Sequence, residues 1–231
     1  MPRKRKTAET EQDASSSVTQ SGAVEEPADQ KKQQLERQQY PFEPYPASKA
    51  YRLVEPGPVL LVSTGSLADS THNLMTIGFH MVIQHESPAL IGVSIGPWDA
   101  SFATLKSRRQ CVLAVPAVEM APDVVDIGNC SADDGVDKWA RFDLEPLPAE
   151  KVEAPLVGGE HVIANIECVV EDTRMVSKYS MWVLKVVKAW VVEARMKTAK
   201  TFHHRGDGIF AVDGDVLNLQ ERMTKWKQFQ D

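Results

Sequence analysis

Hydrophobic and polar positions alternate most regularly over residues 161–170, HVIANIECVV. The even-numbered positions, Val162 to Val170, are apolar, while His161, Asn165 and Glu167 fall on the opposite side. Alternation with a period of two is typical of a strand that buries one face and exposes the other. The pattern therefore predicts a half-buried antiparallel strand in this segment.

Shorter apolar runs, bounded by Pro, Gly and polar loops, predict further strands. They cover Pro58–Thr64, Asn73–Ile83, Ala89–Ile95, residues 111–116 and Met181–Val192. The last run has lysines three positions apart, as a helix could, but its Val and Trp content favours a strand. A hairpin across Asp172–Lys178 would join it to the strand before it.

Helical spacing is confined to short segments. Ser101–Ser107 suits a helix capped by Asp99 or Ser101, and Glu119–Ile127 has apolar residues at helical intervals. Asp134–Trp139 suits one further helical turn. The end of the chain carries a turn-forming Asp-Gly in IFAVDGDVLNL, and then helical spacing at Leu219, Met223 and Trp226.

Six or more strands with short helices inserted, and no regular alternation of strand and helix, indicate a mainly β fold. We expect an antiparallel barrel with helical excursions and disfavour a doubly wound parallel sheet. Residues 1–40 contain almost no large apolar side chains, so they cannot offset the entropy cost of ordering. We therefore predict a disordered polar tail over 1–40 and one domain over 41–231.

The charge and the cysteine content of the chain limit the kinds of binding partner and the cellular compartment that we expect. The net charge of −6 argues against nucleic acid as a partner, although the basic start MPRKRK would suit one. Three widely spaced cysteines predict neither a disulfide framework nor a zinc site. His203 and His204 have no Cys or third His at ligand spacing nearby, so we expect no metal site. With no apolar run of roughly twenty residues, we expect no membrane span. The predicted location is the cytoplasm.

The glycine-rich loops that commonly hold phosphates, GxGxxG and GxxxxGK[ST], are absent. Hydroxyls and main-chain N–H groups at a loop or helix N-terminus bind a phosphate by another route. Two places offer them: Ser70 to Thr76, and Ser101 with Thr104.

Taken in chain order, several segments resemble one family. They are PGPVLLVST, HNLMTIGFHMVIQHESPALIGVSI, WDASFATLKSRRQCVLAVP, VDKWARFDL and IECVVED. Their order and spacing are similar to those of the flavin reductase-like, FMN-binding split-barrel family, which includes flavoredoxin-type proteins. The resemblance implies a Greek-key antiparallel split barrel and a homodimer, with FMN in a groove near the subunit interface.

The resemblance also implies the flavin-binding residues. Those after the first strand and at the start of the next are Thr64, Asn73, Leu74, Met75 and Thr76. Ser94 and Ile95 would meet the flavin ring, and Ser101 is the preferred phosphate ligand. Lys138, in VDKW, matches a recurrent family lysine, while Lys106 and Arg108 are alternative cations. His204, with His203 and Arg205, would border the flavin edge or the nicotinamide entry, or form only a structural loop.

The function implied is that of an FMN-binding oxidoreductase with NAD(P)H as donor, and FAD is the alternative flavin. It would serve a partner oxygenase or another redox protein, or reduce a small substrate. No catalytic triad is expected, because flavin chemistry requires positioning and not an acid–base pair. The alternative is a non-enzymatic, flavodoxin-like electron carrier or flavin-binding module that a protein donor reduces. A third hypothesis is a scaffold that binds nucleic acid through MPRKRK.

Overall fold

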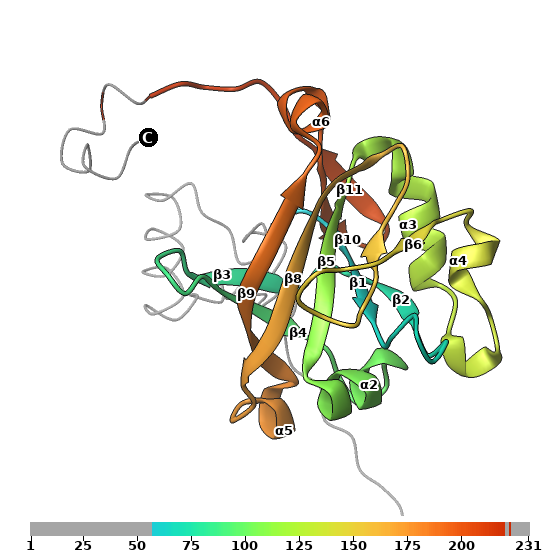
Figure 1. Cartoon of the computed structure of the whole chain (residues 1–231). Coiled ribbons are helices and arrows are strands. Elements are labelled where there is room, and N and C mark those ends of the chain that lie inside the picture. The colour runs from blue at the N-terminus through green and yellow to red at the C-terminus, as the bar shows by residue number, and fades with distance from the viewer. Residues whose placement is uncertain (1–56, 220–221, 223–231) are drawn as a thin grey trace, which may run out of the picture. The chain divides into compact units, whose positions relative to one another are not determined.

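A seven-stranded antiparallel sheet forms the centre of the computed structural model, which describes residues 57–219 and residue 222 (Figure 1). The strand order is β2-β1-β5-β8-β9-β4-β3. The strands are β1 (Leu60–Thr64), β2 (Asn73–Ile77), β3 (His80–Gln84), β4 (Leu90–Ser94), β5 (Gln110–Pro116), β8 (Val162–Asp172) and β9 (Met181–Val191). The predicted tail over 1–40 and the helical positions Met223 and Trp226 lie outside the described residues.

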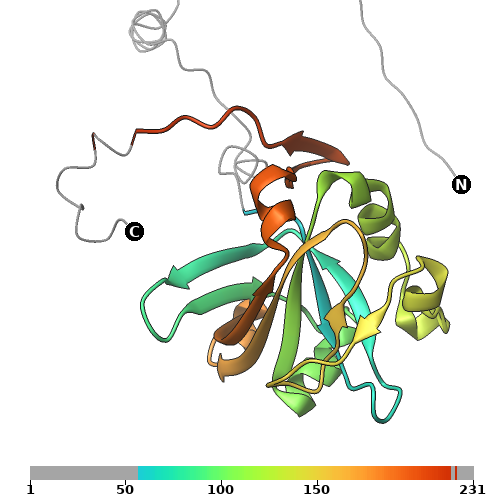
Figure 2. The same cartoon turned by 45° about the horizontal axis from the view of Figure 1, so that its top comes forward.

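The sheet curls because its two edge strands are consecutive in the chain. β2 ends at Ile77 and β3 begins at His80, so only Gly78 and Phe79 connect opposite edges of the sheet. The three residue steps from Ile77 to His80 span at most about 11 Å, which brings those strand ends together. The predicted single strand Asn73–Ile83 is therefore wrong. It is two strands, β2 and β3, because the chain crosses there from one edge of the sheet to the other. In Figure 2 the β3–β4 hairpin projects from one side of the sheet, away from α3 and α4 on the other.

Successive residues of β1 pack into two separate cores. Leu60 and Val62 join a cluster inside the curled sheet with Leu113 and Trp182. Leu61 packs on the outer side, in a cluster that includes the buried Trp139. Side chains that alternate across a strand explain why β1 is buried along its whole length.

The predicted half-buried character of β8 is wrong where Asn165 and Glu167 are concerned, because both side chains are buried. The small sheet of β6 (Pro146–Leu147) and β7 (Leu156–Val157), with the segment between them, covers this face. Asn165 exchanges two hydrogen bonds with the main chain of Val157, at 2.8 and 3.0 Å. The antiparallel pairing of β8 is confirmed.

Short helices connect the strands, as predicted. They are α2 (Ser101–Arg108), η2 (Val118–Met120), α3 (Ala121–Gly128), η3 (Ala132–Asp134), α4 (Lys138–Arg141), α5 (Val176–Tyr179) and α6 (Glu193–Thr198). α5 lies within the predicted β8–β9 hairpin connection.

A separate hairpin pairs β10 (Phe202–Gly206) with β11 (Ile209–Val212). Its turn uses Asp207 and Gly208, both with positive φ, so it is not the predicted turn at Asp213–Gly214. Asp213 instead accepts hydrogen bonds from the main chain and hydroxyl of Thr201. Through Leu219 the described chain has no strand after β11.

Candidate functional site

A pocket of about 230 Å³ opens between three parts of the fold: the edge strand β2, the start of α2 and the loop that follows α3. Five of the ten predicted flavin-binding residues line it: Asn73, Met75, Thr76, Ser101 and Lys138. They come from segments that are up to 65 residues apart in the chain, between Asn73 and Lys138. The fold therefore brings together the two phosphate-binding segments that the sequence predicts separately.

The start of α2 is held by a tight turn. The N–H of Asp99 donates to the Gly96 carbonyl at 3.0 Å, and the Asp99 carboxylate accepts from the Gly96 N–H at 2.7 Å. Asp99 is thus committed to the turn, and the predicted side-chain cap is wrong, because Ala100 occupies the N-cap position without a side-chain hydrogen bond. The N–H of Phe102 donates to the Asp99 carbonyl at 2.8 Å, and the remaining first-turn N–H groups of α2 are left for other acceptors.

Ser101 connects this helix to β2. Its side chain is 1% exposed, and its hydroxyl accepts a hydrogen bond from the Asn73 amide at 3.0 Å. The hydroxyl proton of Ser101 is donated to no residue that the structure describes. Ser101 therefore presents a positioned donor at the pocket surface. Thr76, by contrast, uses its hydroxyl to donate to the Val124 carbonyl at 2.5 Å.

Lys138 lies at the first position of α4 and is only 4% exposed. Asp137 fixes this helix start by accepting the N–H groups of Trp139 and Ala140. The Lys138 ammonium donates to the Ile127 carbonyl at 3.1 Å, and no described carboxylate lies within ion-pair distance of it. Burial lowers the pKa of Lys138, although Cys130 and Asp99 oppose the shift. Two of its three N–H donors remain for a ligand.

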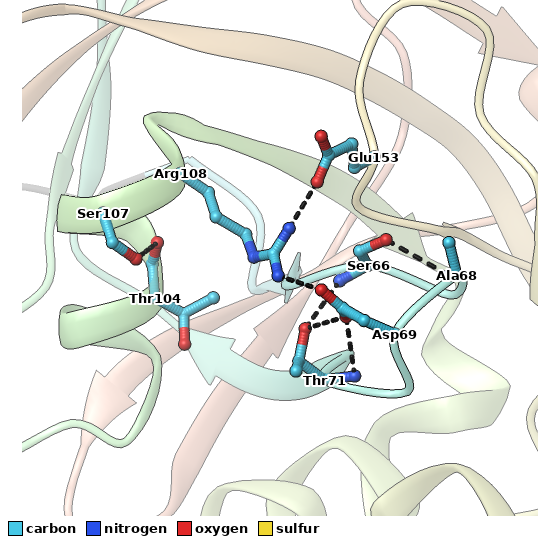
Figure 3. Close-up of polar contacts among 8 residues, drawn as sticks. All are labelled: Ser66, Ala68, Asp69, Thr71, Thr104, Ser107, Arg108 and Glu153. Atoms are coloured by element: carbon cyan, nitrogen blue, oxygen red, sulfur yellow. Dashed lines mark hydrogen bonds and ion pairs between the residues drawn. The ribbon is translucent and has the colours of Figure 1, made fainter.

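The alternative cations lie elsewhere. Lys106 is exposed and does not line the pocket. The Arg108 guanidinium forms ion pairs with Asp69 and Glu153, as Figure 3 shows. These contacts fix the loop between β1 and β2, where Asp69 also accepts from the Thr71 hydroxyl at 2.5 Å. Arg108, at the end of α2, is therefore held by two carboxylates and has a structural role.

The other five predicted residues do not line the pocket. Leu74 and Ile95 are buried in the two cores. Thr64 is also fully buried, and its hydroxyl has no partner among the residues that the structure describes. Ser94 lies in β4, and the His204 ring packs against Phe210 in the β10–β11 hairpin, 5.1 Å between centroids.

Sequence reasoning missed the loop after α3 as part of the site. Asn129, Cys130, Ser131 and Asp134 line the pocket, as does Trp98 on the other side. The run GNCSADD, residues 128–134, is a cluster of small polar residues between two helical segments, and such clusters mark loops. That signal identifies a loop but does not indicate which strand it faces.

The described residues hold no group of three or more His, Cys, Asp or Glu side chains arranged to bind a metal ion. Among these same residues, none of the helices combines the length and apolar character that crossing a bilayer requires.

Residues 52–209 match the model of the flavin reductase-like domain family. The chain belongs to that family. An uncharacterised protein of Pyrococcus abyssi is 30% identical over 139 residues, which cover 60% of this chain and 76% of the relative.

Two solved structures share the fold of this flavin reductase-like chain. One is an FMN-binding domain of a flavin reductase-like enzyme from Shewanella baltica, with a TM-score of 0.64 and 22% identity, covering 75% of this chain and 95% of the other. The second is flavoredoxin of Desulfovibrio vulgaris, with a TM-score of 0.66 and 19% identity, covering 77% and 96%. The predicted split-barrel fold is thereby confirmed.

Proposed function

We propose that this flavin reductase-like chain binds FMN through the pocket between β2, α2 and the loop after α3. The observation that carries the proposal is the buried Lys138 ammonium, which faces the pocket without a counter-ion among the described residues. A buried cation is costly unless it is paired, and an FMN phosphate, with close to two negative charges, would pair with it.

The neighbouring donors fit the same group. Ser101 offers its hydroxyl proton, and the start of α2 offers main-chain N–H groups and the positive end of the helix dipole. Asn73 would hold the Ser101 hydroxyl in place. We propose that these residues bind the phosphate and that Met75 and Thr76 contact the adjoining part of the flavin. The predicted residues outside the pocket would support the fold around it without contacting the flavin; they are Thr64, Leu74, Ser94, Ile95 and His204.

We further propose an oxidoreductase that takes electrons from NAD(P)H. When bound, FMN supplies hydride and single-electron chemistry, so the chain's own task is to orient the flavin and shape its surroundings. The second candidate is an electron carrier reduced by another protein, which the likeness to a flavoredoxin supports. Steady-state oxidation of NADH and NADPH by the FMN-loaded protein distinguishes the two, since the carrier would turn over neither.

A homodimer is the assembly we propose. β3 is an edge strand of the sheet, and Phe79, Met81, Val82 and Ile83 on and beside it are 45–73% exposed. An exposed apolar edge strand is an aggregation hazard unless a partner covers it. Light scattering should give the mass of a dimer, and Val82→Asp should shift it toward a monomer. We also propose that the protein delivers reduced flavin to a partner oxygenase in the cytoplasm.

The direct test of flavin binding is the visible spectrum of the purified protein, with mass identification of the group released on denaturation. Release of FMN supports the proposal. A folded protein that stays colourless after incubation with both FMN and FAD contradicts it.

The location of the flavin has its own test. Cys130 lines the pocket and is partly exposed, whereas Cys111 and Cys168 are buried. FMN should therefore slow alkylation of Cys130 by N-ethylmaleimide, with the two buried thiols as internal references. Unchanged alkylation in the presence of bound FMN would place the flavin elsewhere.

A further inference from the structure

Trp98 is the most exposed large aromatic side chain beside the pocket, with 76% of its surface accessible. It occupies the third position of the Gly96–Asp99 turn, directly after Pro97. Both main-chain and side-chain hydrogen bonds of Asp99 close this turn, so its backbone is well fixed. A large apolar ring is therefore displayed on a rigid support at the edge of the site.

Gly96 supports the indole from beneath. A Cβ atom at Gly96 would lie 2.3–2.5 Å from Cζ2, Cε2 and Cη2 of Trp98, so the benzene part of the ring rests directly on this glycine. Gly96 itself is buried, while Trp98 remains open to solvent. The arrangement leaves a flat apolar surface free to stack on a second ring.

The distance along the chain from Trp98 to the proposed phosphate site indicates which kind of ligand ring could stack on the indole. Trp98 precedes Ser101 by three residues and lines the same pocket. Most side chains around the phosphate donors are polar, among them Asn129, Ser131 and Asp134, and Trp98 is the aromatic one. A planar group attached through a phosphate would therefore find its stacking partner at Trp98.

We infer that Trp98 is a stacking surface for the adenine of an adenosine phosphate, and so a specificity-determining residue of the site. The inference rests on the proposed flavin function and sharpens it. Two ligands carry this chemistry: FAD, whose adenosine extends from the flavin phosphate, and a pyridine nucleotide bound beside FMN. Stacking of a base on an aromatic side chain contributes enough to be measured by alanine substitution.

The experiment compares the full-length protein with Trp98→Ala, Gly96→Ala and the matched control Trp98→Phe. Flavin-free protein is titrated with FMN and with FAD, and FMN-loaded protein is titrated calorimetrically with ADP-ribose, which carries adenine but no redox-active ring. Trp98→Phe keeps an aromatic face. Gly96→Ala keeps the indole but displaces it, because the added Cβ would overlap the ring.

If FAD is the ligand, Trp98→Ala weakens FAD binding about 5- to 100-fold, leaves FMN binding within about twofold, and Trp98→Phe retains most of the affinity. If a pyridine nucleotide is the ligand, the same loss appears with ADP-ribose while the FAD-to-FMN ratio stays constant. In either case Gly96→Ala should reproduce the loss.

Two results overturn the inference while leaving the proposed function intact. One is unchanged affinity for all three ligands in Trp98→Ala, and the other is an equal loss for FMN and FAD, which would place Trp98 against the flavin itself. If the first result is accompanied by a change of oligomeric mass in Trp98→Ala, the indole makes a protein contact instead. Failure of the parent protein to bind any flavin contradicts the proposed function and this inference together.

Discussion

Two buried charged side chains, Glu167 on β8 and Lys138 on α4, have surroundings that differ in one respect. The Glu167 carboxylate is fully buried and accepts four hydrogen bonds, from the Trp190 indole at 2.7 Å and from the main-chain N–H groups of Glu150, Lys151 and Val152 at 2.5–3.2 Å. Within the described part of the chain, the Lys138 ammonium makes one hydrogen bond, and it lines a pocket. The first charge is saturated by the fold, and the second is not.

The pKa of each group is lowered, but a lowered pKa favours the charged form of a carboxyl group and disfavours that of an ammonium group. Burial raises the pKa of Glu167, and the Trp190 and main-chain hydrogen bonds outweigh it, so the fold favours the charged form. Burial lowers the pKa of Lys138, so the fold disfavours the charged form there. A satisfied buried charge indicates a structural role, and an unsatisfied one beside a pocket indicates a ligand of opposite charge.

The largest expected effect is on stability, at Glu167. Glu167→Gln turns an amide NH₂ toward main-chain donors and should lower the free energy of unfolding by about 2–3 kcal/mol. Urea unfolding of the flavin-free protein measures it. Glu171→Gln is the control, because Glu171 lies on the same strand in an exposed ion pair with Lys185. A loss at Glu167 no larger than at Glu171 would contradict the structural role.

The pH dependence follows from the direction of the shift. Because the folded-state pKa of Glu167 is depressed, its contribution is present above the unfolded-state pKa and is lost as the pH falls through the folded-state value. The stability difference between the parent and Glu167→Gln should therefore shrink in acid.

The next largest effect is on flavin affinity, at Lys138. Lys138→Met removes the charge and keeps most of the volume, and should weaken FMN binding about 10- to 100-fold. The flavin-free variant should be at least as stable as the parent, because an unpaired buried charge is removed and the Ile127 carbonyl keeps the Cys130 N–H as a partner. Lys106→Met, on the exposed side of α2, is the matched control. Equal FMN affinities of Lys138→Met and Lys106→Met would show that Lys138 does not bind the flavin phosphate.

FMN affinity should also depend on pH through the same lysine. The charged ammonium binds the phosphate, so affinity falls as the pH rises through the pKa of Lys138, which lies below that of an ordinary lysine before the flavin binds. We expect a loss of about tenfold at the alkaline end, because a charge-assisted hydrogen bond is worth that much. Fluorescence titration at several pH values measures it, and Lys138→Met should lack the dependence.

The smallest effect is at Ser101. Ser101→Ala removes one neutral donor and should weaken FMN binding about 3- to 10-fold. Ser107→Ala is the control, since Ser107 lies at the other end of α2 and donates to the Thr104 carbonyl at 3.1 Å. Equal affinities in the two variants would argue that the phosphate does not contact the Ser101 hydroxyl.

The sequence alone determined most of the strands and short helices and the chemistry that they carry. Period-two alternation identified β8, Val-rich runs identified β1 and β9, and Ser101 was recognised as a donor at the start of a helix. These features are local, because strand and helix patterns depend on residues within a few positions of each other.

Only the tertiary structure decided which of the candidate groups meet. The two-residue passage at Gly78 and Phe79, which closes the sheet, has no distinctive pattern of its own, and the cover over Glu167 comes from a segment some fifteen residues away. The sequence favours Lys138 over Lys106 and Arg108 only through the family resemblance. In the fold, the Lys138 ammonium is buried without a counter-ion among the described residues, whereas carboxylates hold Arg108. Pairing and burial depend on contacts distant in the chain, and so they were settled by the fold.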